Sequence, residues 1–392
     1  MVTMKFRHLL SVIPFFVVLV LLPLTASPLQ SPRNLGLESA LREIDAQISA
    51  DFARDETGGV SVGVIAGGGL VWTKHLGFAD VEKKRVATND TAYRIGSITK
   101  QFTALMLLQL VERGTMSLSD PLEKYVPEVR RLTGGRPGTR PITLLQVASM
   151  MSGLAREPGC ANSSVGPVSV WKQKVIECLP MTQYQFDPGT QYLYSNIGYA
   201  TLGLALERAS AQPYTAYVRE RILVPLGMSR TSFEPTADIR KNLAHGYMRQ
   251  TAQSKPDRTV PDRQLDGRGY RVPNGALFST VTDLAKFAAW ELGDGPASLL
   301  KKETQDANYA GTYAGAEQLS RGYGIGFMVE RRGNLVFIGH NGSTDGFVSA
   351  MFVHRLTKTA VIVLHNGDGG SFNPTTEAYQ ALEKIVAAAS VR

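Results

Sequence analysis

The chain has 392 residues, of which 43% are hydrophobic and 19% charged, and this composition allows one large domain or two lobes. Its formal net charge of +8 is mild for this length, and the Lys and Arg residues are scattered, without a nucleic-acid-binding motif. The two Cys and six His residues lack the spacing of metal ligands. We therefore predict no nucleic-acid partner, no metal site and no other cofactor.

The N-terminal segment has the pattern of a secretory signal. Basic Lys5 and Arg7 precede a nearly continuous apolar run over residues 9–22, which contains Pro14 and is short for a membrane-spanning helix. We expect cleavage near Ala26, which would release a periplasmic or secreted protein. The alternative is an uncleaved segment that anchors the protein, and this is the only membrane association that we predict.

Segments rich in β-branched residues occur near both ends of the chain. Residues 60–82 have the pattern of a hairpin, and residues 335–364 contain three further strand-like runs. Helical patterns fill the long middle, and a last helix is predicted over residues 375–389. This order predicts an α/β protein of the α+β type, in which a central antiparallel sheet formed from both chain ends is flanked by helices and carries an inserted, mostly helical lobe.

We divide the chain accordingly into a signal segment and one domain of two lobes. The boundaries are 1–26 for the signal, 36–392 for the domain, 36–95 and 320–392 for the sheet lobe, and 96–319 for the helical lobe. A cleft between the lobes is the default position for an active site.

Ser97-Ile-Thr-Lys100 stands at the start of a predicted helix that continues to Arg113. Residues three apart on a helix are surface neighbours, so the Lys100 amine can reach the Ser97 hydroxyl. A serine is a weak nucleophile until a neighbouring base accepts its proton. A lysine that is desolvated at the base of a cleft has a lowered pKa and can be that base.

The spacing alone does not identify the nucleophile, because Ser169 and Ser298 are also followed by a lysine three residues later. Only Ser97 follows a β-like segment and opens a long apolar helix, whereas the other two precede short mixed segments that are typical of caps or surface turns. Ser61 fits a G-x-S-x-G pattern, but it lies inside a continuous β-rich run and not at a strand-to-helix turn. We interpret Ser61 as a strand residue.

Two later segments carry further polar groups. Tyr194-Ser195-Asn196 precedes a predicted helix, which Ser195 or Asn196 could cap. The second interpretation is that Tyr194 and Asn196 point the same way into the cleft, where a phenol relays a proton and an amide holds a carbonyl group. His340-Asn341-Gly342 ends a predicted strand, and an imidazole at a sheet edge could bind a carboxylate or assist proton transfer.

These three segments, in this order, resemble the motifs of the serine β-lactamase and penicillin-binding-protein superfamily. The Tyr-x-Asn form of the second motif is similar to the branch that contains class C β-lactamases, D-alanyl-D-alanine carboxypeptidases and family VIII esterases. In the third motif, His340 stands where many members have lysine. The likeness covers most of residues 42–388.

The resemblance implies roles for the matching residues. Ser97 would be acylated by the substrate, and Lys100 and Tyr194 would share its proton. The backbone N–H groups of Ser97 and Ser343 would form the oxyanion hole. The substrate-binding residues would be Asn196, His340, Asn341 and Gly342.

The function that we predict is an exported serine hydrolase that works through an acyl-enzyme on an amide or ester, such as a D-amino-acid peptide or a small ester. Its partner would be a small-molecule or peptide substrate. A histidine in the third motif occurs among peptidases and esterases of this branch. The alternatives are a class C-like β-lactamase and a non-catalytic penicillin-binding or assembly module.

Cys160 and Cys178 lie 18 residues apart in a chain that we expect to be exported. Oxidation is permitted outside the cytosol, so a disulfide between them is one interpretation. Two isolated, small buried residues are the other.

Overall fold

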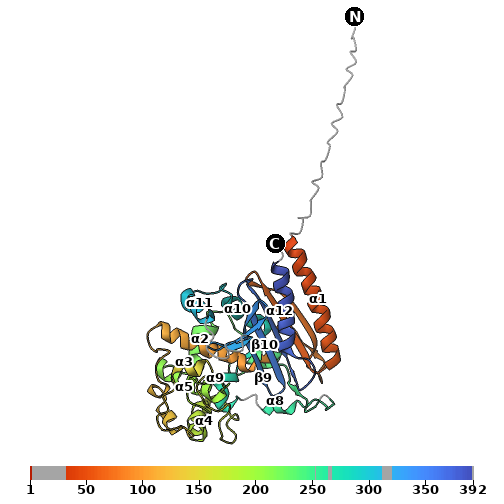
Figure 1. Cartoon of the computed structure of the whole chain (residues 1–392). Coiled ribbons are helices and arrows are strands. Elements are labelled where there is room, and N and C mark those ends of the chain that lie inside the picture. The colour runs from red at the N-terminus through yellow and green to blue at the C-terminus, as the bar shows by residue number, and fades with distance from the viewer. Residues whose placement is uncertain (2–31, 252, 264–266, 311–319, 391–392) are drawn as a thin grey trace.

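The structure is a computed structural model, and it describes all residues except 2–31, 252, 264–266, 311–319 and 391–392 (Figure 1). The predicted signal, residues 1–26, lies outside the described residues apart from Met1. Among the residues that are described, no helix is long and apolar enough to cross a membrane.

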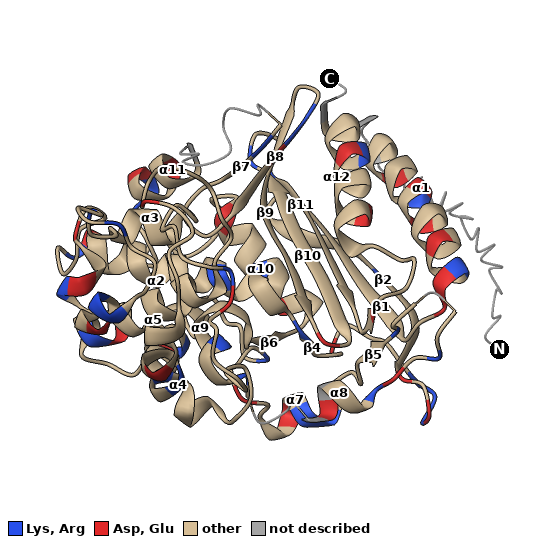
Figure 2. Ribbon diagram, turned by 60° about the horizontal axis from the view of Figure 1, so that its bottom comes forward, with Lys and Arg blue, Asp and Glu red and all other residues tan. Residues whose placement is uncertain are grey.

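An eight-stranded antiparallel sheet is built from both ends of the chain (Figure 2). Because β1 from the N-terminal end pairs with β11 from the C-terminal end inside this sheet, the predicted fold class is confirmed. In sheet order the strands are β3 (Arg85–Val86), β2 (Gly69–Asp80), β1 (Gly59–Ala66), β11 (Thr359–His365), β10 (Phe347–His354), β9 (Leu335–Thr344), β8 (Met328–Arg332) and β7 (Arg321–Tyr323).

Helices cover both faces of this sheet, and alternate strand residues therefore belong to different cores. Val361 of β11 packs in the core below α1 (Pro32–Asp55) and α12 (Pro374–Ser390). Its neighbour Ile362 packs in the core on the other face, which α10 (Val281–Glu291) covers. α10 lies within the range 96–319 that we assigned to the helical lobe, yet it contacts the sheet.

The remaining elements form the helical lobe and its connections to the sheet. The α-helices are α2 (Thr99–Glu112), α3 (Leu144–Ala148), α4 (Trp171–Cys178), α5 (Asn196–Ser210), α6 (Tyr214–Val218), α7 (Ala237–Asn242), α8 (Thr259–Arg263), α9 (Val272–Gly275) and α11 (Lys302–Ala310). The short strands are β4 (Tyr93–Arg94), β5 (Tyr247–Met248), β6 (Phe278–Ser279) and β12 (Gly367–Asp368). The 3-10 turns are η1 (Gly96–Ile98), η2 (Leu122–Lys124), η3 (Pro127–Arg131), η4 (Val168–Val170), η5 (Leu179–Met181) and η7 (Gly269–Arg271), and η6 (Arg219–Leu223) is a π-helical turn.

The buried helix α2 joins the two lobes. All its residues from Thr99 to Leu110 are buried, as its apolar sequence predicts. It contacts α5 and α9 on the side of the helical lobe, while η1 directly before it contacts β9 of the sheet. The start of α2 is therefore held where the lobes meet.

Candidate active site

Ser97 and Lys100 lie at the junction of η1 and α2. The Lys100 Nζ atom is 3.0 Å from the Ser97 Oγ atom. Lys100 is completely buried, whereas Ser97 keeps part of its surface exposed. The helical turn thus forms the expected nucleophile and base pair, with the nucleophile on the accessible side.

Lys100 has two further partners, both of which are oxygen atoms. Its Nζ atom is 2.9 Å from Asn196 Oδ1 and 2.9 Å from the carbonyl oxygen of Asn274. A neutral amine has two N–H groups and one lone pair, and these two oxygens can only accept hydrogen bonds. When Lys100 is neutral, its lone pair is therefore left for the Ser97 hydroxyl proton.

The surroundings of Lys100 favour this neutral form. Burial lowers its pKa well below the ordinary value, and the positive charges of Arg156, Arg271 and Arg268 act in the same direction. The negative charge of Glu157 acts against them. A lysine in such surroundings is suited to accept the serine proton at neutral pH.

Tyr194 reaches the same serine from the other segment. Its side chain forms a hydrogen bond with Ser97, and Lys100 Nζ lies 4.8 Å from the centre of its ring. Burial raises the pKa of the Tyr194 phenol, although Ser97 and the charge of Arg156 oppose this. The phenol is therefore protonated at neutral pH and donates to Ser97 Oγ, while Lys100 accepts.

Ser195 and Asn196 each take one of the two roles that we considered for their segment, which are capping of the following helix and contact with the active site. Ser195 Oγ accepts a hydrogen bond of 3.0 Å from the Gly198 N–H and caps α5. Asn196 is the first residue of this helix and turns its amide to Lys100. Capping and the contact with the site thus coexist because they involve different side chains.

His340 lies on β9, which is an inner strand of the sheet, so our expectation of a sheet edge was wrong. Its Nδ1 atom donates to the carbonyl oxygen of Asn341, and its Nε2 atom accepts from the Tyr323 hydroxyl at 3.0 Å. Burial and the charge of Lys100 lower the pKa of His340 to about 3. The imidazole is neutral at physiological pH and offers no positive charge to a substrate carboxylate.

The residues after His340 separate on the two faces of β9. The Asn341 side chain points to α12, where its Nδ2 atom lies 3.3 Å from Thr375 Oγ1. Successive strand residues face opposite sides, so the structure does not bring this expected substrate-binding side chain to Ser97.

Two glycines allow η1 to lie directly against β9. A Cβ atom on Gly342 would overlap the carbonyl oxygen of Ile95, and one on Gly96 would lie 2.9 Å from the Ser343 backbone nitrogen. Gly96 also has a φ of +50°, which favours glycine. This close approach brings the Ser343 backbone beside the turn that carries Ser97, which is the arrangement that an oxyanion hole between these two residues needs.

Sequence comparison agrees with this arrangement. A model of the family described as Beta-lactamase matches residues 44–384. The chain belongs to the β-lactamase family. Protein flp of Staphylococcus aureus (strain NCTC 8325 / PS 47) is 28% identical to it over 325 residues, which are 83% of this chain and 63% of that protein. The chain thus spans less than two thirds of the length of this curated relative.

Solved structures of the β-lactamase and penicillin-binding-protein type share the fold. The octameric penicillin-binding protein homologue from Pyrococcus abyssi has a TM-score of 0.72 at 26% identity, and the match covers 88% of this chain and 77% of that one. The β-lactamase/D-alanine carboxypeptidase from Yersinia pestis, complexed with citrate, has a TM-score of 0.69 at 23% identity, with 91% and 99% covered. The predicted superfamily is therefore confirmed.

The rival serines of this β-lactamase family member lie elsewhere. Ser61 is completely buried in β1, where its Oγ atom lies 2.9 Å from both Tyr93 OH and His75 Nδ1. Ser169 and Ser298 are exposed, on η4 and in a turn. Ser61 is therefore inaccessible to a substrate, and Ser169 and Ser298 lie on the surface. Ser97, by contrast, is partly exposed and hydrogen-bonded to a buried lysine.

Three residues of the site were missed by sequence reasoning. They are Asn274, which accepts from Lys100, Glu157, which accepts from Asn196 Nδ2 at 2.6 Å, and Tyr323, which donates to His340. Each contributes through contacts with residues far away in the chain, and none belongs to a short motif. No local pattern in the sequence marks them.

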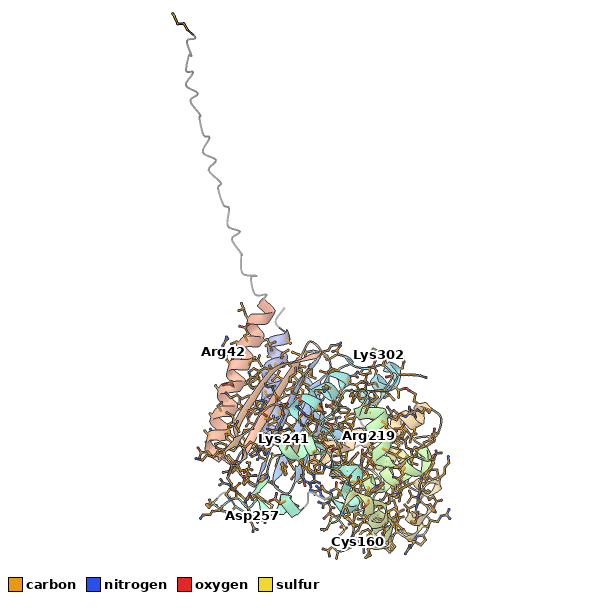
Figure 3. The ribbon with its side chains drawn as sticks, turned by 180° about the vertical axis from the view of Figure 1, so that it is seen from behind. Arg42, Cys160, Arg219, Lys241, Asp257 and Lys302 are labelled. Atoms are coloured by element: carbon orange, nitrogen blue, oxygen red, sulfur yellow. A yellow bond between two sulfur atoms is a disulfide. The ribbon has the colours of Figure 1, made fainter. Side chains whose placement is uncertain are left out.

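Cys160 and Cys178 form a disulfide, with Cα atoms 5.5 Å apart (Figure 3 labels Cys160). Among the described residues, one group has donor atoms close enough for a metal ion, namely Asp80, Glu82 and His245. Lys83 and Arg258 approach its carboxylates to 3.8 and 3.4 Å. These positive charges already compensate the group, and it carries no step at Ser97.

Proposed function

We propose that this protein is an exported serine hydrolase that acts through an acyl-enzyme on an amide or ester, such as a D-amino-acid peptide or a small ester. The observation that carries this proposal is the arrangement around Lys100. Both other partners of its amine are obligatory acceptors, so the neutral amine turns its lone pair to Ser97 Oγ.

In the proposed reaction, Ser97 Oγ forms a bond with the carbonyl carbon while its proton passes to Lys100. The carbonyl oxygen becomes an oxyanion, which the backbone N–H groups of Ser97 and Ser343 would stabilise by several kcal/mol. The intermediate expels the leaving group, which takes a proton from Lys100 through Tyr194. Water then attacks the ester carbon of the acyl-enzyme, loses its proton to the same pair and releases Ser97.

Three observations bear on export and on the alternatives. A disulfide is typical of proteins in oxidising compartments, and this supports export to the periplasm or beyond. A buried lysine is costly to retain without a purpose, which speaks against a non-catalytic module. The third motif carries the neutral His340 in place of a cationic lysine, which supports a peptidase or esterase over a β-lactamase.

The test is labelling with a fluorophosphonate probe, followed by mass spectrometry and a substrate panel. We expect the adduct on Ser97, its loss in Ser97→Ala, and its retention in the matched control Ser169→Ala. Labelling that survives in Ser97→Ala would contradict the mechanism. In the panel of p-nitrophenyl esters, D-Ala-D-Ala peptides and a chromogenic cephalosporin, rapid turnover of the cephalosporin alone would favour the β-lactamase alternative.

A further inference from the structure

We propose that Arg156 and Glu157 are positioning residues: Glu157 orients the Asn196 amide, and the opposite charges of Arg156 and Glu157 act on Lys100 and Tyr194 in opposite directions. Neither residue belongs to the three motifs. The inference deepens the proposed hydrolase function and rests on it. It implies that one short loop segment, Arg156-Glu157, sets the electrostatic surroundings of Lys100 and Tyr194, the two groups that exchange the Ser97 proton.

Glu157 determines which way the Asn196 amide faces. Its Oε1 atom accepts from Asn196 Nδ2 at 2.6 Å, and its Oε2 atom accepts from the Tyr270 hydroxyl and from Arg271 Nη2 at 3.0 Å. An ionised carboxylate can only accept hydrogen bonds, so Asn196 must present Nδ2 to it and Oδ1 to Lys100. The direction of the Lys100 lone pair therefore depends on Glu157.

Arg156 acts on the other proton-exchanging group. Its guanidinium carbon lies 4.8 Å from the centre of the Tyr194 ring, the same distance as Lys100 Nζ. The Arg156 cation and the Lys100 amine therefore both lie close to one phenol ring. The Arg156 Nε atom is also 3.9 Å from Glu157 Oε1, so the two charges of the segment are held side by side.

Hydrogen bonds hold this segment against the second motif. The backbone N–H of Asn196 donates to the Arg156 carbonyl oxygen at 2.8 Å, and Ser195 Oγ donates to the Ala155 carbonyl oxygen at 2.8 Å. The disulfide at Cys160 ties the same loop to the end of α4. These links hold the backbone of the segment in place beside Tyr194 and Asn196.

The charges that face each group have opposite signs. Burial lowers the pKa of Lys100, the charge of Glu157 raises it, and the charges of Arg156, Arg271 and Arg268 lower it further. His340 also lies near this amine: the charged form of Lys100 lowers the pKa of the imidazole, which is neutral at physiological pH.

Around Tyr194, burial raises the pKa of the phenol. The hydrogen bond with Ser97 and the charge of Arg156 lower it, and Tyr192 and Glu157 raise it. Arg156 and Glu157 thus act in opposite directions on both groups.

Glu157 stays ionised at neutral pH and can exert this effect. Burial raises the pKa of its carboxyl, but the hydrogen bond from Tyr270 and the charge of Arg271 outweigh burial and lower it. The Arg156 and Glu157 side chains are 62% and 37% exposed, so solvent screens part of their charge. With this screening, we expect each charge to move the titration of Lys100 by about one pH unit.

The informative variants are Glu157→Gln and Arg156→Gln. Glutamine at 157 keeps an oxygen that accepts from Asn196 Nδ2 but removes the charge. Arg219 and Glu220 are a matched control, since they are another adjacent Arg-Glu ion pair, at 2.9 Å, on the surface of the helical lobe (Figure 3 labels Arg219). They are not among the groups that act on Lys100 or Tyr194.

The experiment follows the protonation of Lys100 by NMR of ¹³Cε-labelled lysine, with the signal assigned by its loss in Lys100→Arg. We expect the midpoint to fall by about one pH unit in Glu157→Gln and to rise by about one pH unit in Arg156→Gln. Arg219→Gln and Glu220→Gln should leave it unchanged. The acid limb of kcat/KM, measured on the best ester of the panel, should move with the midpoint.

Midpoints that stay in place, or that move the same way in both variants, would overturn the inference. The NMR measurement needs no turnover, so it separates the two proposals. If the Lys100 midpoint moves as expected but the protein hydrolyses no substrate of the panel, only the proposed function is contradicted. If the protein hydrolyses substrate but the midpoint stays the same in the variants, only this inference is contradicted. Because Arg156 is exposed, Arg156→Gln decides the question by itself where Glu157→Gln does not yield folded protein.

Discussion

Replacing Lys100 by methionine tests both the chemistry and the energetics of the buried amine. Methionine is similar in length and apolar, so it removes the base while filling most of its volume. We expect kcat/KM to fall by about 10²–10⁴-fold, the usual contribution of a general base. Asn196 Oδ1 and the Asn274 carbonyl lose their donor, at about 1–3 kcal/mol each.

In the wild type, burying Lys100 also costs folding free energy, and this cost depends on pH. Its removal in Lys100→Met offsets part of the destabilisation caused by the two acceptors that lose their donor. The pKa of Lys100 is lower in the folded protein than in the unfolded chain, so the unfolded chain binds more protons between the two values. The folded state is therefore penalised below the ordinary pKa of 10.5, and the penalty grows as the pH falls toward the folded-state pKa. One proton changes stability by about 1.4 kcal/mol per pH unit.

Lys100→Met removes this pH-dependent penalty. Relative to the wild type, its free energy of unfolding should therefore fall by up to about 2.7 kcal/mol between pH 7 and pH 9. Urea unfolding of both proteins at the two pH values measures this, and other titrating groups cancel in the difference. Lys301→Met, at the exposed lysine of a rival motif, is the control. A difference between wild type and Lys100→Met that stays constant with pH would refute the claim that Lys100 is neutral when folded.

Two further substitutions test how the site is held. Gly342→Ala should destabilise the protein by about 1–3 kcal/mol in chemical unfolding and reduce labelling of Ser97, because the new methyl group overlaps the Ile95 carbonyl. Gly69→Ala, with nothing within 4 Å of its Cβ, is the control, and equal costs at both positions would contradict the close approach of η1 and β9. Cys160→Ser should lower the free energy of unfolding by about 3 kcal/mol, as expected for a loop closed by cysteines 18 residues apart, and addition of dithiothreitol to the wild type should give a similar loss. A reductant that leaves the wild-type melting curve unchanged would speak against that contribution.

The sequence by itself determined those features that depend on neighbouring residues. Ser97 and Lys100 meet because a helical turn brings residues three apart together, and Ser195 caps α5 because a serine before a helix accepts from its first turn. The apolar run after Lys100 predicted a buried helix, and the β-rich runs at both ends predicted a sheet made from both.

Tertiary structure alone decided the electrostatics and the remaining partners. Asn274 is 174 residues from the lysine that it contacts, and Glu157 is 39 residues from Asn196, whose amide joins it to Lys100. Burial of the His340 imidazole between distant elements lowers its pKa and keeps it neutral. These contacts arise from strand order and lobe packing, which join residues that are distant in the chain, whereas periodicity and capping record only the local backbone.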